Sequence, residues 1–120
     1  PANGGTQRIL SQLPYAIGME MLLTGDAMDA ETAARWGLVN RVVPMKDLMN
    51  EALLVAEKIA SGAPLAMQAA KELAIRARDM PLSTGLRFEQ LVLQMLQSTE
   101  DASEGPSAFA QKRVPEFKGK

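Results

Sequence analysis

Proline and glycine divide the chain from residue 44 onward into stretches of helical length, and this spacing limits the possible folds more than any other feature. Between Pro44 and Gly62, apolar residues recur at i, i+4, i+7, i+8 and i+11, at Leu48, Ala52, Val55, Ala56 and Ile59. Such a stripe is typical of an amphipathic helix with one buried face. Two further helices are predicted to begin near Pro64 and near Pro81, the second reaching Ser98. The chain is therefore predicted to be mainly α.

Shorter elements are predicted in the first third of the chain. Pro14 and Gly25 bracket one helix, because proline suits a first turn and glycine suits the left-handed residue after the last turn. Asp29 is a good N-cap for a helix over 30–36, since its carboxylate can accept the free amide of residue 31 or 32. Residues 38–43 are short and rich in β-branched side chains, so they are the one strand candidate. A lone strand has to pair with something else.

The predicted third helix is apolar on more than one side. Five of the six residues in 91–96 are apolar, and in a chain of 120 residues there is little material to cover several faces. Part of this surface is therefore expected to meet another subunit or a domain outside the sequence.

The composition excludes several classes of function. The chain has no Cys and no His, which rules out a disulfide framework, thiolate or imidazole metal ligands and a histidine base. A net charge of -1 and 4% aromatic residues argue against a nucleic-acid partner. No stretch approaches the roughly 20 apolar residues of a membrane span. We expect a soluble, cytoplasmic type of protein whose amino terminus, which lacks Met and a leader, begins in mid-protein.

A few clusters near the amino terminus are candidates for chemistry, each with a simpler alternative. The pair Gly4-Gly5 suits a backbone nest for an anion, although a tight turn without ligand is the favoured interpretation. Asp26, Asp29 and Glu31 resemble a small carboxylate cluster, but helix capping explains two of them and no metal site is predicted. Glu20 lies among apolar residues and is a candidate acid or base, with a solvated face as the preferred interpretation. The methionines are dispersed, which favours gap-filling in cores.

The tail from Glu100 to Lys120 is predicted to be a short helix with an acidic start and a basic end. Phe109 and Lys112 are three positions apart, which would place an aromatic ring and an ammonium group on one side of a helix. A ring can cover a purine while a cation meets a phosphate. The simpler alternative, favoured by composition, is a tail with one buried ring and a solvated basic end.

The order of these residues resembles one protein family along the whole chain. The matching segments are Pro1-x-x-Gly4-Gly5-Thr6-Gln7-Arg8-Ile9-Leu10, Ala16-x-x-Met19-Glu20-x-x-Leu23-Thr24-Gly25, Asp29-Ala30-x-x-Ala33-x-x-Trp36-Gly37-Leu38-Val39-Asn40-Arg41-Val42-Val43 and Glu104-Gly105-x-x-Ala108-Phe109-x-x-Lys112-Arg113-x-Pro115-x-Phe117-x-Gly119. Together they resemble the enoyl-CoA hydratase/isomerase family, also called the crotonase family. The residues at 34–37 and 40–43, together with Pro115 near the end, also resemble the carnitinyl-CoA dehydratase branch. Ala2 stands where the family often has glycine, so the local turn differs there.

The resemblance implies a fold and separate roles for two segments of the chain. It implies the carboxy-terminal helical part of a crotonase-like α/β spiral, with one short strand near 38–43. Residues 1–43 would end the core, and residues 44–120 would form a helical domain for trimer formation and for covering coenzyme A. The two oxyanion-hole amides and the catalytic carboxylates of the family fall outside this sequence, so no catalytic residue is assigned. Phe109 and Lys112 match the positions that approach the adenine and phosphate end of coenzyme A.

The resemblance also implies an activity for the intact protein. Hydration of a 2-enoyl-CoA is the first expectation, with double-bond isomerisation or a carnitinyl-CoA type of dehydration as alternatives. The substrate would be a coenzyme A thioester, with no covalently bound cofactor, and the assembly a homo-oligomer, either a trimer or a dimer of trimers. The chain alone is expected to be an inactive fragment. From another class, a non-catalytic helical oligomerisation module stays open.

Overall fold

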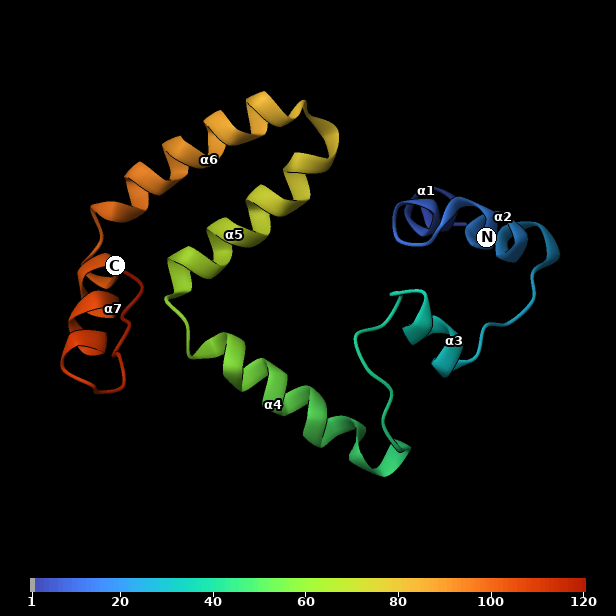
Figure 1. The fold of residues 1–120 in the computed structure, drawn as a ribbon, viewed down its shortest axis with the longest axis horizontal. Coiled ribbons are helices and arrows are strands. Elements are labelled where there is room, and N and C mark those ends of the chain that lie inside the picture. The colour runs from blue at the N-terminus through green and yellow to red at the C-terminus, as the bar shows by residue number, and fades with distance from the viewer. Residues whose placement is uncertain (1) are drawn as a thin grey trace. The chain divides into compact units, whose positions relative to one another are not determined.

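The computed structural model describes residues 2–120, and these residues form helices and connecting turns (Figure 1). Pro1, the first residue of the family motif, lies outside the described residues. The α-helices are α1 (Gly5–Arg8), α2 (Tyr15–Thr24), α3 (Ala30–Arg35), α4 (Leu48–Ala60), α5 (Pro64–Arg76), α6 (Leu82–Gln97) and α7 (Glu100–Ala110). Short 3-10 turns are η1 (Ile9–Ser11), η2 (Met45–Asp47) and η3 (Ala77–Asp79). The prediction of a mainly α chain is confirmed.

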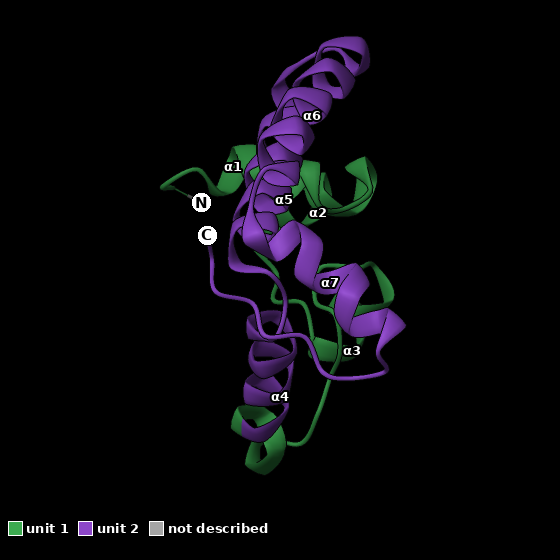
Figure 2. Ribbon diagram, turned by 90° about the vertical axis from the view of Figure 1, so that its left-hand side faces the viewer, with its two compact units in different colours: residues 1–49 green, residues 50–120 purple. Residues whose placement is uncertain are grey.

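The chain divides into two compact units, residues 1–49 and residues 50–120 (Figure 2). This boundary lies in the first turn of α4. The assignment of 1–43 to a core and of 44–120 to a trimerisation domain stays a prediction.

The first unit is organised by close packing of α2 on η1. Gly18 of α2 is buried, and a Cβ built there would lie 2.8 Å from the Leu10 side chain, so only glycine fits without a shift. Leu13 is also buried at this contact. The predicted bracketing of α2 is confirmed, since Pro14 precedes its first residue and Gly25 follows its last with a φ of 73°. Each end of the helix is therefore set by its local sequence.

The strand prediction for residues 38–43 is wrong. Among residues 2–120 no strand is formed, and residues 38–43 follow the end of α3 as bends and irregular chain. The amide of Leu38 instead donates to the carbonyl of Ala33, closing α3. β-branched residues favour a pleated surface only when a neighbouring strand supplies hydrogen bonds, and the described part of the chain offers no such neighbour. Val39 and Val42 are accordingly exposed.

The second unit is a series of helices in which α5 and α6 form an antiparallel hairpin around η3 (Figure 1). The starts near Pro64 and Pro81 and the end at Ser98 are confirmed, because Pro64 begins α5, Pro81 precedes α6 and Ser98 follows its last residue. Along 91–96 the apolar side chains of Leu91, Leu93 and Met95 are exposed. The expectation that another subunit or domain covers these side chains stays a prediction. No helix in the described chain is long and apolar enough to cross a membrane.

Candidate functional site

The carboxy-terminal helix α7 and the tail that follows it form the most elaborate polar structure in the second unit. Thr99 caps the amino terminus of α7, its hydroxyl accepting from the amide of Ala102 at 3.2 Å. Beyond Ala110 the chain turns, and the tail returns alongside α7 toward its first turn (Figure 1). The acidic start of this helix was predicted; the return of the tail was not.

The end of α7 is closed by a left-handed turn at Lys112. The Lys112 amide donates to the carbonyl of Phe109 at 3.2 Å, and the Arg113 amide donates to the carbonyl of Ala108 at 3.0 Å. This pair of hydrogen bonds is the Schellman motif. Its left-handed residue, which is usually glycine, is here Lys112 with a φ of 53°.

The expectation that Phe109 and Lys112 share one side of a helix is therefore wrong. Phe109 is in α7, whereas Lys112 lies in the turn after the helix has ended at Ala110. The turn links the two residues through their backbones, by the hydrogen bond from the Lys112 amide to the Phe109 carbonyl. The Phe109 ring is 87% exposed, so the alternative of a buried ring is also wrong in this chain. Their role toward a ligand stays a prediction.

Glu104 joins the middle of α7 to the tail. Its carboxylate accepts from both terminal nitrogens of Arg113, at 2.5 and 2.8 Å, and from the amide of Glu116 at 2.7 Å. The hydrogen bonds from Arg113 and then that from the Glu116 amide lower the pKa of Glu104 from 4.5 to about 2. The same pairing raises the pKa of Arg113. Glu104 is consequently ionised at neutral pH and fully occupied by the tail.

Asp101 joins the first turn of α7 to the end of the tail. Its two carboxylate oxygens accept from the amides of Lys118 and Gly119, at 2.7 and 2.8 Å. The side chain is buried, with 5% of the residue exposed, and Ala108, two turns further along α7, is 1% exposed. The carbonyl of Lys120 accepts from the Glu100 amide at 2.8 Å. We call the Glu104, Asp101 and Lys120 contacts together the tail clasp.

A cavity of about 500 Å³ lies between α7 and the tail. Its lining residues are Glu100, Asp101, Ser103, Glu104, Arg113, Glu116 and Lys118. Four acids and two bases give it mixed charge, which does not favour an anionic ligand. Phe109 and Lys112 are outside this lining, so the clasp and the predicted ligand contact are separate features of the same segment.

The amino-terminal candidates resolve into local structure. Asp29 caps α3, its carboxylate accepting from the amide of Thr32 at 2.6 Å, as predicted; this contact lowers its pKa. Glu20 is exposed at the edge of a cavity of about 240 Å³ between α2 and α3. Residues 2–120 contain no group of three or more acidic side chains placed to hold a metal ion.

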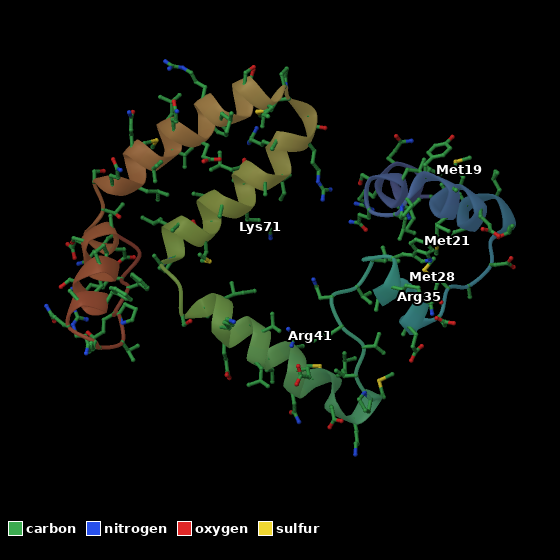
Figure 3. All side chains as sticks on the ribbon, in the orientation of Figure 1. Met19, Met21, Met28, Arg35, Arg41 and Lys71 are labelled. Atoms are coloured by element: carbon green, nitrogen blue, oxygen red, sulfur yellow. The ribbon has the colours of Figure 1, made fainter. Side chains whose placement is uncertain are left out.

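The glycine pair forms the tight turn that was favoured over an anion nest. Gly4 has a φ of 84°, and the Arg8 guanidinium donates to the carbonyl of Asn3 at 2.7 Å, lying beside Gly4. The methionines of this unit are dispersed over different sides (Figure 3): Met19 lies on the outer side of α2, while Met21 faces α3 across the small cavity. Met45 is 85% exposed and Met95 of α6 is 72% exposed, so the prediction that the methionines fill gaps in a core is wrong for these two residues.

Comparison with known proteins gives a consistent result along the chain. The family model described as enoyl-CoA hydratase/isomerase matches residues 1–120. A relative named (E)-benzylidenesuccinyl-CoA hydratase, from Thauera aromatica, is 46% identical over 96% of this chain and 45% of its own length. A relative named carnitinyl-CoA dehydratase, from Citrobacter koseri, is 46% identical over all of this chain and 48% of its own length.

Solved structures agree with the sequence relatives. An enoyl-CoA hydratase from Bacillus anthracis superposes with a TM-score of 0.97 at 38% identity, covering all of this chain and 46% of that one. The hydratase EchA1 from Mycobacterium marinum superposes with a TM-score of 0.94 at 37% identity, covering 99% of this chain and 47% of that one. The chain thus spans about half the length of the proteins it matches, and it corresponds to the helical, carboxy-terminal part of their crotonase fold.

Proposed function

Because the chain belongs to the enoyl-CoA hydratase/isomerase family, we propose that the protein containing it adds water to a 2-enoyl-CoA or removes water from the hydroxyacyl-CoA. The observation that carries this proposal is the pair of names borne by relatives that are each 46% identical, one a hydratase and the other a dehydratase of a CoA thioester. Addition and removal of water are one equilibrium in two directions. Isomerisation is supported by the broader description of the family and by solved structures named enoyl-CoA hydratase/isomerase.

The chemistry requires groups beyond those of this segment. Water addition to an enoyl thioester builds negative charge on the thioester oxygen, which preorganised hydrogen-bond donors stabilise, while a general acid and base move the proton and activate water. We propose that these groups belong to the half of the fold that this chain does not span. On this proposal residues 1–120 supply helical cover and a contact for the nucleotide end of coenzyme A.

The activity is tested by following the loss of the conjugated enoyl-thioester absorbance with crotonyl-CoA. We expect turnover by the longer protein and none by the 120-residue chain. Turnover by the pure chain would contradict the placement of the catalytic groups. A longer protein that moves the double bond without adding water would be an isomerase, and one with neither activity would be a non-catalytic helical module.

Phe109 and Lys112 are the proposed ligand contact. A charge-assisted hydrogen bond from an exposed lysine to a phosphate is worth about 1 to 1.5 kcal/mol. In the longer protein, Lys112→Ala is therefore expected to raise KM for the CoA thioester by about tenfold at most, with kcat little changed. The effect should shrink at high salt because of screening.

A pantetheine thioester, which lacks the nucleotide, is the control for this contact. It has no phosphate at that end, so Lys112→Ala and the parent should use it equally well. Equal losses on both substrates would mean that Lys112 acts through folding.

The apolar run 91–96 is the proposed contact with a second copy of the protein, in a trimer or a dimer of trimers. Leu93 is about half exposed in this chain. Leu93→Asp would place an unpaired charge in such an interface and is expected to dissociate the assembly. Light scattering that shows an unchanged oligomer for this variant would exclude the run as the interface.

A further inference from the structure

The left-handed backbone at Lys112 needs an explanation, because a glycine there would avoid the strain. A side chain in the left-handed region crowds the following carbonyl, and such residues persist where the surrounding structure holds them. Lys112 has a φ of 53° at the helix end where glycine is usual. The left-handed backbone therefore makes Lys112 a candidate for a residue whose side chain has a function.

The tail clasp is the structure that holds this turn. The contact nearest to the turn is the bidentate ion pair between Glu104 and Arg113, and Arg113 is the residue directly after Lys112. The next is the Glu116 amide on the same carboxylate, and the last is Asp101 with the amides of Lys118 and Gly119. These contacts therefore hold in place the backbone that leads into and out of residue 112.

The clasp also separates the roles of the two neighbouring cations. The charge of Arg113 is neutralised by Glu104 at 2.5 and 2.8 Å, and its Nε donates to the Gln111 side chain at 2.8 Å. Lys112 has no ion-pair partner among residues 2–120. A free anion meeting this turn would find the ammonium of Lys112 available and the guanidinium of Arg113 already occupied.

We propose that Glu104, acting through Arg113, is a positioning residue that holds the turn so that Lys112 meets a phosphate of coenzyme A. This inference rests on the proposed function, in which Lys112 contacts the nucleotide end of the substrate. Arg113 supplies the backbone anchor and Glu104 supplies its counter-charge. Asp101 fixes the far end of the tail.

The test measures binding as well as turnover in the longer protein. Calorimetric affinities for coenzyme A and for pantetheine are compared for the parent, for Glu104→Gln, Arg113→Gln and Lys112→Ala, and for Glu104→Gln combined with each of the other two. Glu72→Gln is the matched control, because Glu72 pairs with Arg76 on the exposed side of α5, remote in sequence from the tail. Glu104→Gln is expected to weaken coenzyme A binding about fivefold and Glu72→Gln less than twofold, with pantetheine binding unchanged in both.

Double variants separate positioning from direct contact. If Glu104 acts through Arg113 and Lys112, then Glu104→Gln should add less than about twofold in an Arg113→Gln or Lys112→Ala background. An undiminished fivefold loss in either background overturns the proposal. So does an equal loss on coenzyme A and pantetheine.

The outcomes also distinguish this inference from the proposed function. Weaker coenzyme A binding by Glu104→Gln in a protein without hydratase turnover would support the positioning role and reject the activity. A clear effect of Lys112→Ala with none from Glu104→Gln would retain the ligand contact and overturn the positioning role. No effect from either variant would overturn both.

Discussion

In α4, the apolar side chains of Leu48, Val55 and Ile59 are 38–56% exposed, whereas in α7 Ala108 and Asp101 are 1% and 5% exposed. Both helices are amphipathic, but of the two only α7 is covered by a segment of this chain, the tail that follows it. The tail is held chiefly by carboxylates that accept backbone amides, a contact whose two partners are both in this chain. An apolar stripe on a helix indicates that this face is buried, but it does not indicate which segment or subunit covers it. A polar clasp specifies its partner.

The largest effect is expected where α4 meets whatever covers it in the longer protein. Ile59→Asp would bury an unpaired carboxylate there and lower the free energy of unfolding by about 3 kcal/mol or more. Lys58→Gln, on the same helix but off the apolar stripe, is the control and should change it by less than about 0.5 kcal/mol. Urea unfolding measures both. If Ile59→Asp left the free energy of unfolding unchanged, α4 would be exposed in the whole protein as well. The difference in burial between α4 and α7 would then hold for the whole protein.

Removing the buried carboxylate of the clasp should have the next largest effect. Asp101→Ala deletes two charge-assisted hydrogen bonds and is expected to lower the free energy of unfolding by about 2 to 3 kcal/mol. The tail should then be cut readily by protease beyond residue 113. Glu100→Ala, which removes only pairs of 3.8 and 3.9 Å with exposed lysines, should cost less than about 1 kcal/mol. Equal losses from the two variants would show that burial of Asp101 is unimportant.

Acid should open the clasp at Glu104 before its helix is lost. The pKa of Glu104 is lowered from 4.5 to about 2 in the folded state, so its contribution to stability is present above about pH 4.5 and disappears as the pH falls toward 2. The Glu116 amide donates a hydrogen bond to the Glu104 carboxylate, so hydrogen exchange at this amide measures the opening. Glu104→Gln should lack the acid-dependent step. The same step in the variant would assign it to another carboxyl group.

The smallest effect has the opposite sign. Lys112→Gly removes the left-handed strain and is expected to raise the free energy of unfolding by about 1 kcal/mol, while weakening the binding of coenzyme A. Gly119→Ala is the mirror control, because Gly119 also has a left-handed φ, 70°, and a Cβ there should lower stability by a similar amount. Thermal unfolding of both variants provides the comparison. A destabilising Lys112→Gly would mean that the lysine stabilises the turn itself.

Helix ends were predictable from the sequence because they depend on contacts within a few residues. Asp29 reaches the Thr32 amide three positions away, and Gly25 and Pro14 act on their immediate neighbours. That residues 38–43 form no strand was not predictable in this way, because β-branched side chains express only a preference and a strand needs a second segment to pair with.

The candidate site was predicted only in part. The three-residue spacing of Phe109 and Lys112 identified them as a candidate pair, but it led to the prediction that the helix includes Lys112. The local sequence does not mark this lysine as the left-handed residue that follows the end of α7. The clasp was missed altogether. A possible signal was the pair of acids at 101 and 104, one turn apart, with Arg113 after the helix; those contacts span 9 to 18 positions, beyond the reach of local periodicity.

The sequence by itself determined where the helices lie and, through its family motifs, which family the chain belongs to, because capping, periodicity and motif order are local properties. Tertiary structure alone decided the conformation of residues 111–120 and the pairing of Glu104 with Arg113, which leaves Lys112 without an ion-pair partner among residues 2–120. The physical reason is that a carboxylate has many potential donors along a chain. Only the return of the tail along α7 selects which of them it meets.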